Sequence, residues 1–323
     1  MKRYKNFSLD LGRWNHSTLE NLMEHCQVNK KTANERIAFW MEELISIPFA
    51  FESQRMWPEK GHIRVDLETM DCMTLVYYVL ALSRSRDINE FLSQICSFRY
   101  HGDGLIDSDP EKGNIFNFAS EAFLKNAISR KIFIDLTSDL VPKKYLGIFS
   151  ANLKKIRRAK LIDINQNFIS PITQGRVRSE FIVKDGFPYV FKDKIKSGDL
   201  ILFGKKNKND DEELPMLIAH LGFVYRPHDE TNGKIGLYHS TRHFHWNPNG
   251  NIDSRPRFTG FFYDTERKKE QIGTGVAGVF AGEHTKTIVN PNSTCYGMNQ
   301  DEIRSIFDYA SFSFDGFKIL RPL

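Results

Sequence analysis

The sequence lacks the features that mark disulfide scaffolds, small zinc domains and membrane spans. It has four cysteines in 323 residues, at positions 26, 72, 96 and 295, and none of them form a Cys-x-x-Cys pair. That spacing excludes a zinc ribbon or a thioredoxin motif, and so low a count does not predict a disulfide framework. No stretch approaches the roughly 18 apolar residues of a membrane-spanning helix. The composition therefore predicts a globular protein with a substantial core.

A strong excess of either charge is also missing. The net charge is +5, from 45 basic and 40 acidic residues. The densest basic run, Lys154 to Lys160, has no interleaved aromatic residues and matches no nucleic-acid motif, so we expect a solvated helix face there and no nucleic-acid partner. The first six residues are basic, but no apolar signal core follows them. We expect either a cytoplasmic protein or a bacterial periplasmic one whose leader has been removed; no feature predicts an oligomeric state.

Helical patterns dominate the first 135 residues. Ser17-Thr-Leu-Glu20 and Thr32-Ala-Asn-Glu35 match the capping box, in which two side chains satisfy free N–H groups at a helix start. The second of these helices should end near Ile47-Pro48, and an irregular segment, 49–68, should follow as a wall of a substrate groove. Apolar spacing predicts further helices over residues 73–82, 87–98 and 114–130.

The second half of the chain is strand-like. An Asp-Gly turn divides residues 181–191 into two expected strands, and a charged loop is expected over 205–213. Further short apolar strands are expected over residues 197–203, 219–225, 235–240 and 317–321. Helices followed by an antiparallel meander predict an α+β fold, with a helical N-terminal half packed on an antiparallel β-sheet or a partly open barrel.

Cys72 stands where an apolar helix is expected to begin. A helix N-terminus carries partial positive charge and free N–H groups, which favour a thiolate and can hold an oxyanion. A lone cysteine is otherwise most often a small buried hydrophobe. Asp71, Glu68 and Asp66 precede the helix; such carboxylates are commonly helix caps, and a contact with a substrate amine is the alternative.

Two histidines lie inside expected strands and could complete a catalytic site. His220 is in the strand 219–225 and His239 is in the strand 235–240. If these strands pair, both imidazoles can project from one sheet face toward a helix packed on it, as a base and an orienting group for a nucleophile. Core histidines satisfied by hydrogen bonds are the alternative.

Together these motifs resemble the NlpC-type, papain-like cell-wall hydrolases. The resemblance rests on Asp71-Cys-Met-Thr74 opening a helix, the Gly-Asp strand at 197–203, the His-x-Gly strand at 219–225 and Leu237-Tyr-His-Ser240. Arg99-Tyr-His-Gly102 makes the N-acetylmuramoyl-L-alanine amidase-like branch the nearer match. The resemblance covers residues 35 to 245. It implies one papain-like domain over residues 1–323, with a helical extension over about 1–50 and inserted loops over about 105–180.

The resemblance also implies a chemistry. Cys72 would be the nucleophile, His220 the general base and His239 the residue that orients it, with no metal and no cofactor. The implied reaction is hydrolysis of the amide between N-acetylmuramic acid, or its anhydro form, and L-alanine in soluble peptidoglycan fragments (muropeptides). Asp71, Trp57 and Tyr100 are the residues expected to contact the substrate.

The chain departs from the family pattern in places, and other functions stay open. Ser240 and Thr241 replace a usual Ala-Ser pair, no secretion signal is seen, and the loop between Gly204 and Pro215 is long and charged. An endopeptidase or a Cys-His acyltransferase of the same superfamily would use the same residues. A metal hydrolase could use His239 with His243 and His245, and a non-catalytic muropeptide-binding module would need no nucleophile.

Overall fold

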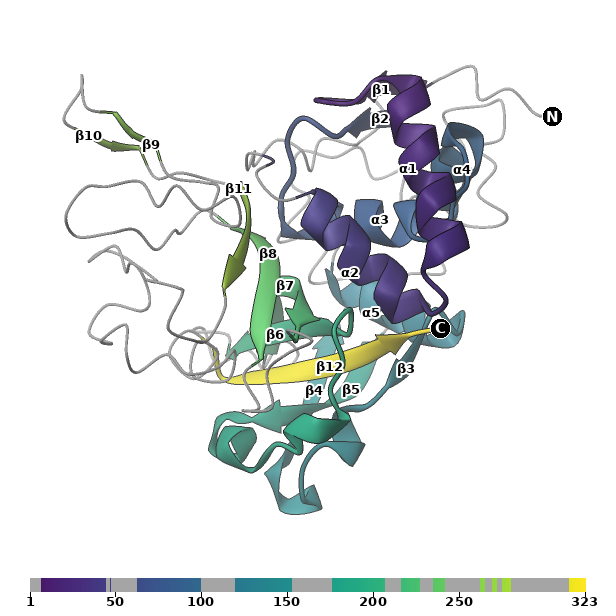
Figure 1. Ribbon diagram of the computed structural model, residues 1–323. Helices are drawn as coiled ribbons and strands as arrows, with labels where there is room; N and C mark the ends of the chain where they lie inside the picture. The colour runs from purple at the N-terminus through teal and green to yellow at the C-terminus, as the bar shows by residue number, and fades with distance from the viewer. Residues whose placement is uncertain are drawn as a thin grey trace.

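Helices lie against one side of a large antiparallel sheet in the computed structural model of the chain (Figure 1). The structure describes residues 7–44, 47, 63–99, 120–152, 176–206, 216–226, 235–241, 262–264, 269–271, 275–279 and 314–323. Within them, the helices come first along the chain and most strands of the sheet follow. The predicted α+β class is therefore confirmed, with an open sheet rather than a closed barrel.

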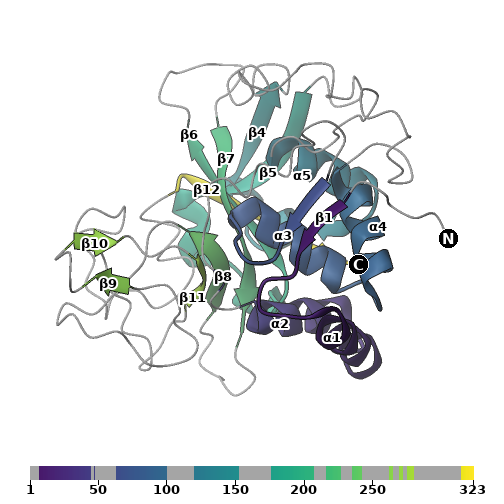
Figure 2. The same ribbon diagram turned by 90° about the horizontal axis from the view of Figure 1, so that it is seen from above.

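The helical layer has α3 as its innermost member (Figure 2). Its described helices are α1 (His16–Asn29), α2 (Ala33–Glu43), α3 (Cys72–Leu82), α4 (Ile88–Arg99) and α5 (Ser120–Ser129). The Thr32/Glu35 capping box opens α2 as predicted, with both reciprocal hydrogen bonds present. The box predicted at Ser17 is wrong, because α1 starts one residue earlier and Asn15 caps it through the backbone N–H of Thr18.

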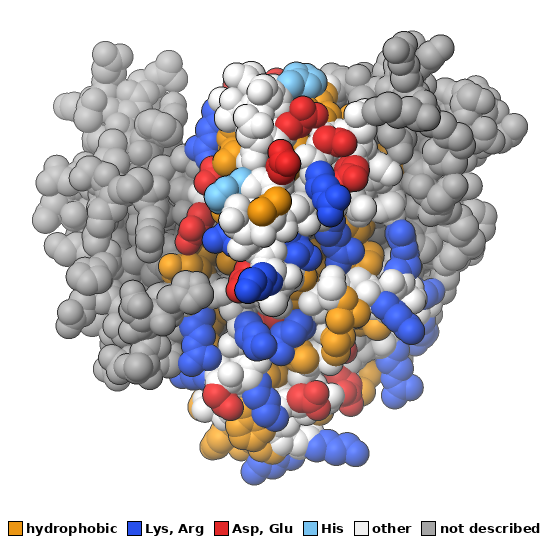
Figure 3. All heavy atoms as spheres, turned by 45° about the vertical axis from the view of Figure 1, so that its right-hand side comes forward, with side chains coloured by type: hydrophobic (Ala, Val, Ile, Leu, Met, Phe, Trp, Pro, Cys, Tyr) orange, Lys and Arg blue, Asp and Glu red, His pale blue; other side chains and the backbone are white. Residues whose placement is uncertain are grey.

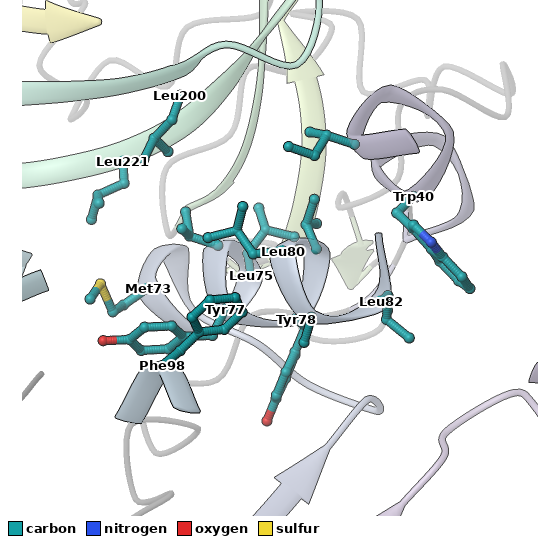
Figure 4. Close-up of a cluster of buried hydrophobic side chains, with 14 of the residues drawn as sticks. Trp40, Met73, Leu75, Tyr77, Tyr78, Leu80, Leu82, Phe98, Leu200 and Leu221 are labelled. Carbon is teal, nitrogen blue, oxygen red and sulfur yellow. The ribbon is translucent and has the colours of Figure 1, made fainter. Parts of the chain in front are cut away.

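Helix α3 is apolar on every side and forms the centre of the core. Every residue from Met73 to Leu82 is buried. Side chains from α2, α4 and the sheet surround it, among them Trp40, Phe98, Leu200 and Leu221 (Figure 4). A helix that is hydrophobic all round must be covered on all sides, and this packing fixes where its N-terminus lies.

The main sheet brings the two ends of the chain's strand-rich part together. Its strands are β3 (Phe133–Asp135), β4 (Leu146–Asn152), β5 (Arg176–Val183), β6 (Leu200–Lys206), β7 (Met216–Tyr225), β8 (Gly236–Thr241), β11 (Gly275–Val279) and β12 (Gly316–Pro322). Their order is β11-β8-β7-β6-β12-β5-β4, with β3 also paired to β12. The last strand of the chain thus lies in the middle of the sheet, between β5 and β6.

The sequence patterns did not predict several of the strands. The expected helical start of the chain contains β1 (Phe7–Asp10), which pairs in parallel with β2 (Ile63–Asp66) from the expected irregular segment. Strands β3 and β4 lie within the stretch expected to hold inserted loops. A second small pair, β9 (Phe262–Asp264) with β10 (Lys269–Gln271), lies outside the main sheet. Short strands form here because distant partners exist, which no local pattern reports.

The second strand predicted after the Asp185-Gly186 turn is wrong. Residues Lys184–Tyr189 instead form a 3₁₀ helix directly after β5. Pro188 lacks the N–H that a strand in a ladder needs, and a β-carbon on Gly186 would lie 2.7 Å from the Tyr145 β-carbon. The chain therefore leaves the sheet at the end of β5 and does not form a second strand paired with it.

Asp199 joins the helical layer to the sheet. The carboxylate is buried and forms an ion pair with Arg321 on β12, at 2.7 Å. Its Oδ1 also accepts a hydrogen bond from Asn34 of α2, at 3.0 Å. The preceding Gly198 has a φ of +83° and lies against the Asn34 backbone, where a β-carbon would come within 2.6 Å of the carbonyl oxygen. The Gly-Asp pair is thus a structural junction between α2, β6 and β12.

None of the helices in the described ranges is both long and apolar enough to cross a membrane, in agreement with the sequence.

Candidate active site

Cys72 is the first residue of α3, as predicted. Asp71 caps the helix: its Oδ1 accepts hydrogen bonds from the backbone N–H groups of Met73 and Thr74, both at 2.8 Å. The Asp71 N–H in turn donates to the Thr74 hydroxyl at 2.9 Å. The sulfur of Cys72 therefore stands at the positive end of a fully packed helix, where a thiolate is stabilised.

The three described cysteines have different surroundings. Cys72 is half-buried, whereas Cys26 and Cys96 are buried in the core. Burial raises the pKa of the Cys26 thiol from 9.0 to about 11 and that of Cys96 to about 12, because the thiolate loses its hydration. Those two cysteines are small core residues, so Cys72 is the described cysteine suited to act as a nucleophile.

His220 on β7 and His239 on β8 contact each other, which the sequence could only suggest. The Nε2 atom of His220 lies 2.6 Å from Nδ1 of His239, and both side chains are buried. Gly222 makes room for the pair, since a β-carbon there would lie 3.1 Å from the β-carbon of His239 and 2.6 Å from the Leu237 side chain. The glycine of the His-x-Gly pattern is therefore a packing requirement of the histidine pair.

Two aromatic rings lie near His220. Phe203 on β6 and Phe314, just before β12, are stacked near the imidazole, with ring centroids 6.1 and 6.2 Å away. A β-bulge between β6 and β7 falls beside this position, so that His220 pairs with Phe203 while Ile218 pairs with Gly204. The sequence did not predict the contact of Phe314 with His220, because no local pattern links a residue near the C-terminus to a strand almost a hundred residues earlier.

Ser240 connects the histidine strand to the loop that leads into α3. Its hydroxyl donates to the backbone carbonyl of Met70 at 2.6 Å, and its side chain is fully buried. Helix α3 packs on β7 and β8, and Leu221 and Tyr238, the neighbours of the two histidines, belong to the core around it. The elements that carry Cys72, His220 and His239 are therefore in direct contact.

The two imidazoles share one face of the sheet, as predicted, but it is not the face that packs on the flank of α3, toward which they were expected to project. Phe203, Val224 and Leu237, which alternate onto the same face, belong to a second hydrophobic cluster rather than to the core around α3. The flank of α3 thus meets Leu221 and Ser240 and not the histidine rings. Any reaction between the sulfur and the histidines must take place at the tip of the helix.

The predicted substrate-contacting residues are placed only in part. Asp71 is buried, and its hydrogen bonds are those of a helix cap. Trp57 and Tyr100 lie outside the described residues, as do His243 and His245 of the alternative metal site. Their roles stay predictions.

Three carboxylates, from Asp10, Asp66 and Glu68, have oxygens within 4.8 Å of one another at the β1–β2 pair. The Asp66 carboxylate accepts hydrogen bonds from the N–H groups of Glu68 and Thr69, at 2.8 and 3.1 Å, and from the Thr69 hydroxyl. These bonds shape the turn between β2 and α3, which explains the position of Asp66 without a metal ion.

The profile of the AmiA-like family, described as N-acetylmuramoyl-L-alanine amidase-like, matches residues 53–244. The chain belongs to this family. The matched range includes Cys72, His220 and His239, and it ends before β11 and β12. No curated protein matches the sequence.

Solved structures with a similar fold extend over nearly the whole chain. A Legionella pneumophila protein of the DUF1460 family has a TM-score of 0.59 at 15% identity, and the match covers 95% of this chain and 94% of that one. An N-acetylmuramoyl-L-alanine amidase from Bacteroides uniformis has a TM-score of 0.51 at 17% identity, covering 90% and 98%. At such identities the likeness establishes the fold and leaves the chemistry to the residues.

Proposed function

We infer that the protein is a cysteine-dependent amidase that cuts between (anhydro-)N-acetylmuramic acid and L-alanine in soluble muropeptides. The observation that carries this inference is the 2.6 Å contact between His220 and His239, on two strands against which the helix of Cys72 packs. Membership of the amidase-like family supports the substrate class.

The histidine contact assigns a role to each ring nitrogen. Since Nε2 of His220 is engaged with His239, the nitrogen left to exchange a proton with the sulfur is Nδ1 of His220. The Nε2–H group then donates to Nδ1 of His239, which fixes the tautomer and stabilises the imidazolium. This is the arrangement of a nucleophile, a base and an orienting group.

The reaction follows from these roles. The Cys72 thiolate attacks the lactyl carbonyl of the muramic acid, and backbone N–H groups at the start of α3 stabilise the oxyanion. As the C–N bond breaks, His220 gives its proton to the leaving amine of L-alanine. Water, deprotonated by His220, then cleaves the thioester and releases the sugar acid, with the sulfur again a thiolate.

The surroundings of His220 suit this cycle. Phe203 and Phe314 limit the space around the imidazole, and the β-bulge next to it displaces the strand locally. The two phenylalanine rings stack on each other, with centroids 4.6 Å apart, and their packing beside the imidazole limits its orientations. Such pre-organisation lowers the entropic cost of reaching the transition state.

The decisive experiment is digestion of purified muropeptides by the wild-type chain and by Cys72→Ala, with products identified by mass spectrometry. We expect the wild type to release intact peptide and free sugar acid, and Cys72→Ala to release neither. Cys96→Ala is the matched control, since a cysteine buried in the core should not affect cleavage.

Other products would replace this proposal with a different one. Cleavage within the peptide would assign an endopeptidase, and transfer of the acyl group to an added amine or lipid would assign an acyltransferase. Cleavage that survives Cys72→Ala and stops with a chelator would assign a metal hydrolase. Binding of muropeptides without any cleavage would leave a binding module.

A further inference from the structure

A lobe of short turns projects below the sheet, and it contains none of the candidate catalytic residues (Figure 1). It consists of residues 137–145 and 184–196, which include four 3₁₀ helices: Thr137–Asp139, Lys143–Tyr145, Lys184–Tyr189 and Lys192–Lys194. We call it the turn lobe; it forms the lower end of the molecule in Figure 1. Backbone hydrogen bonds such as Phe191 N–H to the Leu140 carbonyl, at 2.8 Å, join its two halves.

The turn lobe exposes aromatic side chains that core packing does not explain. Tyr189 is 53% exposed and Phe191 is 43% exposed, while Val190 between them is buried. The backbone at Val190 is extended, and the two exposed aromatic residues flank it in the chain. Tyr145 stacks on Tyr189 with ring centroids 4.5 Å apart and an angle of 9° between the planes.

Lysines accompany these rings. Lys144 lies over Tyr145, with its Nζ 4.9 Å from the ring centroid, and Lys194 lies over Phe191 at 5.0 Å. Figure 3 shows blue side chains among orange ones over the lower part of the described face. The lobe's charged side chains are six lysines, at positions 143, 144, 184, 192, 194 and 196, and three aspartates, at 139, 185 and 193. The surface is thus aromatic and moderately basic.

The order of the stack indicates what could bind. Lys144 lies over the ring of Tyr145, Tyr189 stacks on the same ring, and more than half of Tyr189 faces solvent. Interaction with the Tyr145 side chain also raises the pKa of Tyr189, in keeping with the close stacking of the two rings. A rigid, flat aromatic face of this kind fits the C–H face of a pyranose ring.

The charges distinguish a saccharide from a lipid surface. Stable attachment to an anionic membrane generally needs a cluster of about four to eight basic residues. The six lysines fall within that range, but the three aspartates among them offset half of their charge, which opposes such attachment. Lysines beside the rings can still bind isolated carboxylates.

We propose that the turn lobe is a second binding surface for a glycan that carries carboxylates, in which a pyranose stacks on Tyr189 and Phe191 while neighbouring lysines bind carboxylate groups. The choice of glycan rests on the proposed function, since peptidoglycan strands carry peptide carboxylates at regular intervals. The surface would hold the protein on polymeric wall material without taking part in the reaction.

Co-sedimentation of the intact Cys72→Ala chain with insoluble peptidoglycan sacculi tests this proposal. The inactive chain is used so that cleavage cannot remove the ligand. We expect Tyr189→Ala and Phe191→Ala each to weaken binding about fivefold, in line with the energies of aromatic contacts. The matched control is Val28→Ala, which removes an exposed apolar side chain from α1 (73% exposed) and should leave sedimentation unchanged.

Two further measurements guard the interpretation. Tyr189→Phe should keep most of the binding, because the ring is retained, and thermal unfolding should show that Tyr189→Ala is folded. In the active chain, Tyr189→Ala should leave kcat on a soluble muropeptide unchanged. A failure of the proposed function would appear as absence of cleavage while sedimentation still depends on Tyr189.

Three results would overturn the proposal: no sedimentation of the parent chain, equal sedimentation of the parent and both alanine variants, or binding to vesicles of anionic phospholipid without binding to sacculi. The last would assign the lobe to a membrane surface.

Discussion

Two of the junctions between the helical layer and the sheet are built from different chemical groups. At the first, the buried carboxylate of Asp199 binds Arg321 on the sheet and Asn34 on α2. At the second, the neutral hydroxyl of Ser240 binds the carbonyl of Met70, beside the histidine pair and the start of α3. At the Asp199 junction, both carboxylate oxygens accept hydrogen bonds from charged and polar donors. At the Ser240 junction, one neutral hydrogen bond lies near the half-buried thiol of Cys72.

This difference separates stability from chemistry. Removing one partner of a buried, fully hydrogen-bonded ion pair destabilises the fold strongly. A carboxylate whose oxygens are all engaged in this way is also poorly placed to exchange protons with a substrate. The junction near Cys72 has titratable groups, a polar tie and partial access for solvent, which a reaction requires. We therefore expect substitutions at the Asp199 junction to change the free energy of unfolding, and substitutions at the Ser240 junction to change mainly kcat.

The largest effect should come from His220→Ala. Loss of the proposed general base should lower kcat about 10³-fold, equivalent to about 4 kcal/mol of transition-state stabilisation. His25→Ala, an exposed histidine on α1, is the control and should keep full activity. Steady-state kinetics on a muropeptide measures both variants, and a His220→Ala enzyme with near-normal kcat would show that the histidine pair is only structural.

The next effect should be the loss of stability in Asp199→Ala. This change leaves Arg321 and Asn34 facing each other without their shared acceptor, so we expect about 3 kcal/mol of destabilisation in urea unfolding. Asp193→Ala removes an exposed aspartate nearby and should change stability by less than about 0.5 kcal/mol. The folded Asp199→Ala protein should keep its kcat; a large drop would mean that the two junctions are not separate.

Ser240→Ala should have a smaller effect on both quantities. The carbonyl of Met70 would lose its donor, which should cost about 1 kcal/mol of stability, and the loosened loop should lower kcat about tenfold at unchanged KM. Ser85→Ala is a matched control, because Ser85 is equally buried and donates to the Ala81 carbonyl at 2.7 Å, away from the site. Equal kcat losses in both variants would indicate a general effect of stability and not of positioning.

The sequence predicted the elements of the site better than the contacts between them. The Thr32 capping box, the helix that begins at Cys72 and the strands of His220 and His239 were all recognised from local patterns, because their apolar spacing and caps lie within a few residues. The approach of His220 to His239 depends on the register between β7 and β8, which those patterns do not contain.

Most of the features that the sequence left unpredicted share one cause. The β1–β2 pair, the roles of Asp199 and Phe314, and the central place of β12 all arise from pairing between segments that are far apart in the sequence. Ser17 matched the capping-box pattern, yet Asn15 is the residue that caps α1, through the backbone N–H of Thr18. A short polar motif names the residues that can cap a helix, and tertiary packing decides which one does.

The smallest effect should be found at the cysteines that the site does not use, and it sharpens the contrast between the helix tip and the core. Because the pKa of Cys26 is raised to about 11 and that of Cys96 to about 12, both remain thiols at pH 8, with well under about 1% thiolate. Their thiolates appear only as the pH rises toward these values, so iodoacetamide at pH 8 should modify Cys72 alone among the three in the native chain. Mass spectrometry of a Cys295→Ser protein can measure this, with the urea-unfolded protein as the control in which all three should react. Alkylation of Cys26 or Cys96 in the folded chain at the rate of Cys72 would mean that burial does not distinguish the thiols, and the case for Cys72 would then rest on the histidines alone.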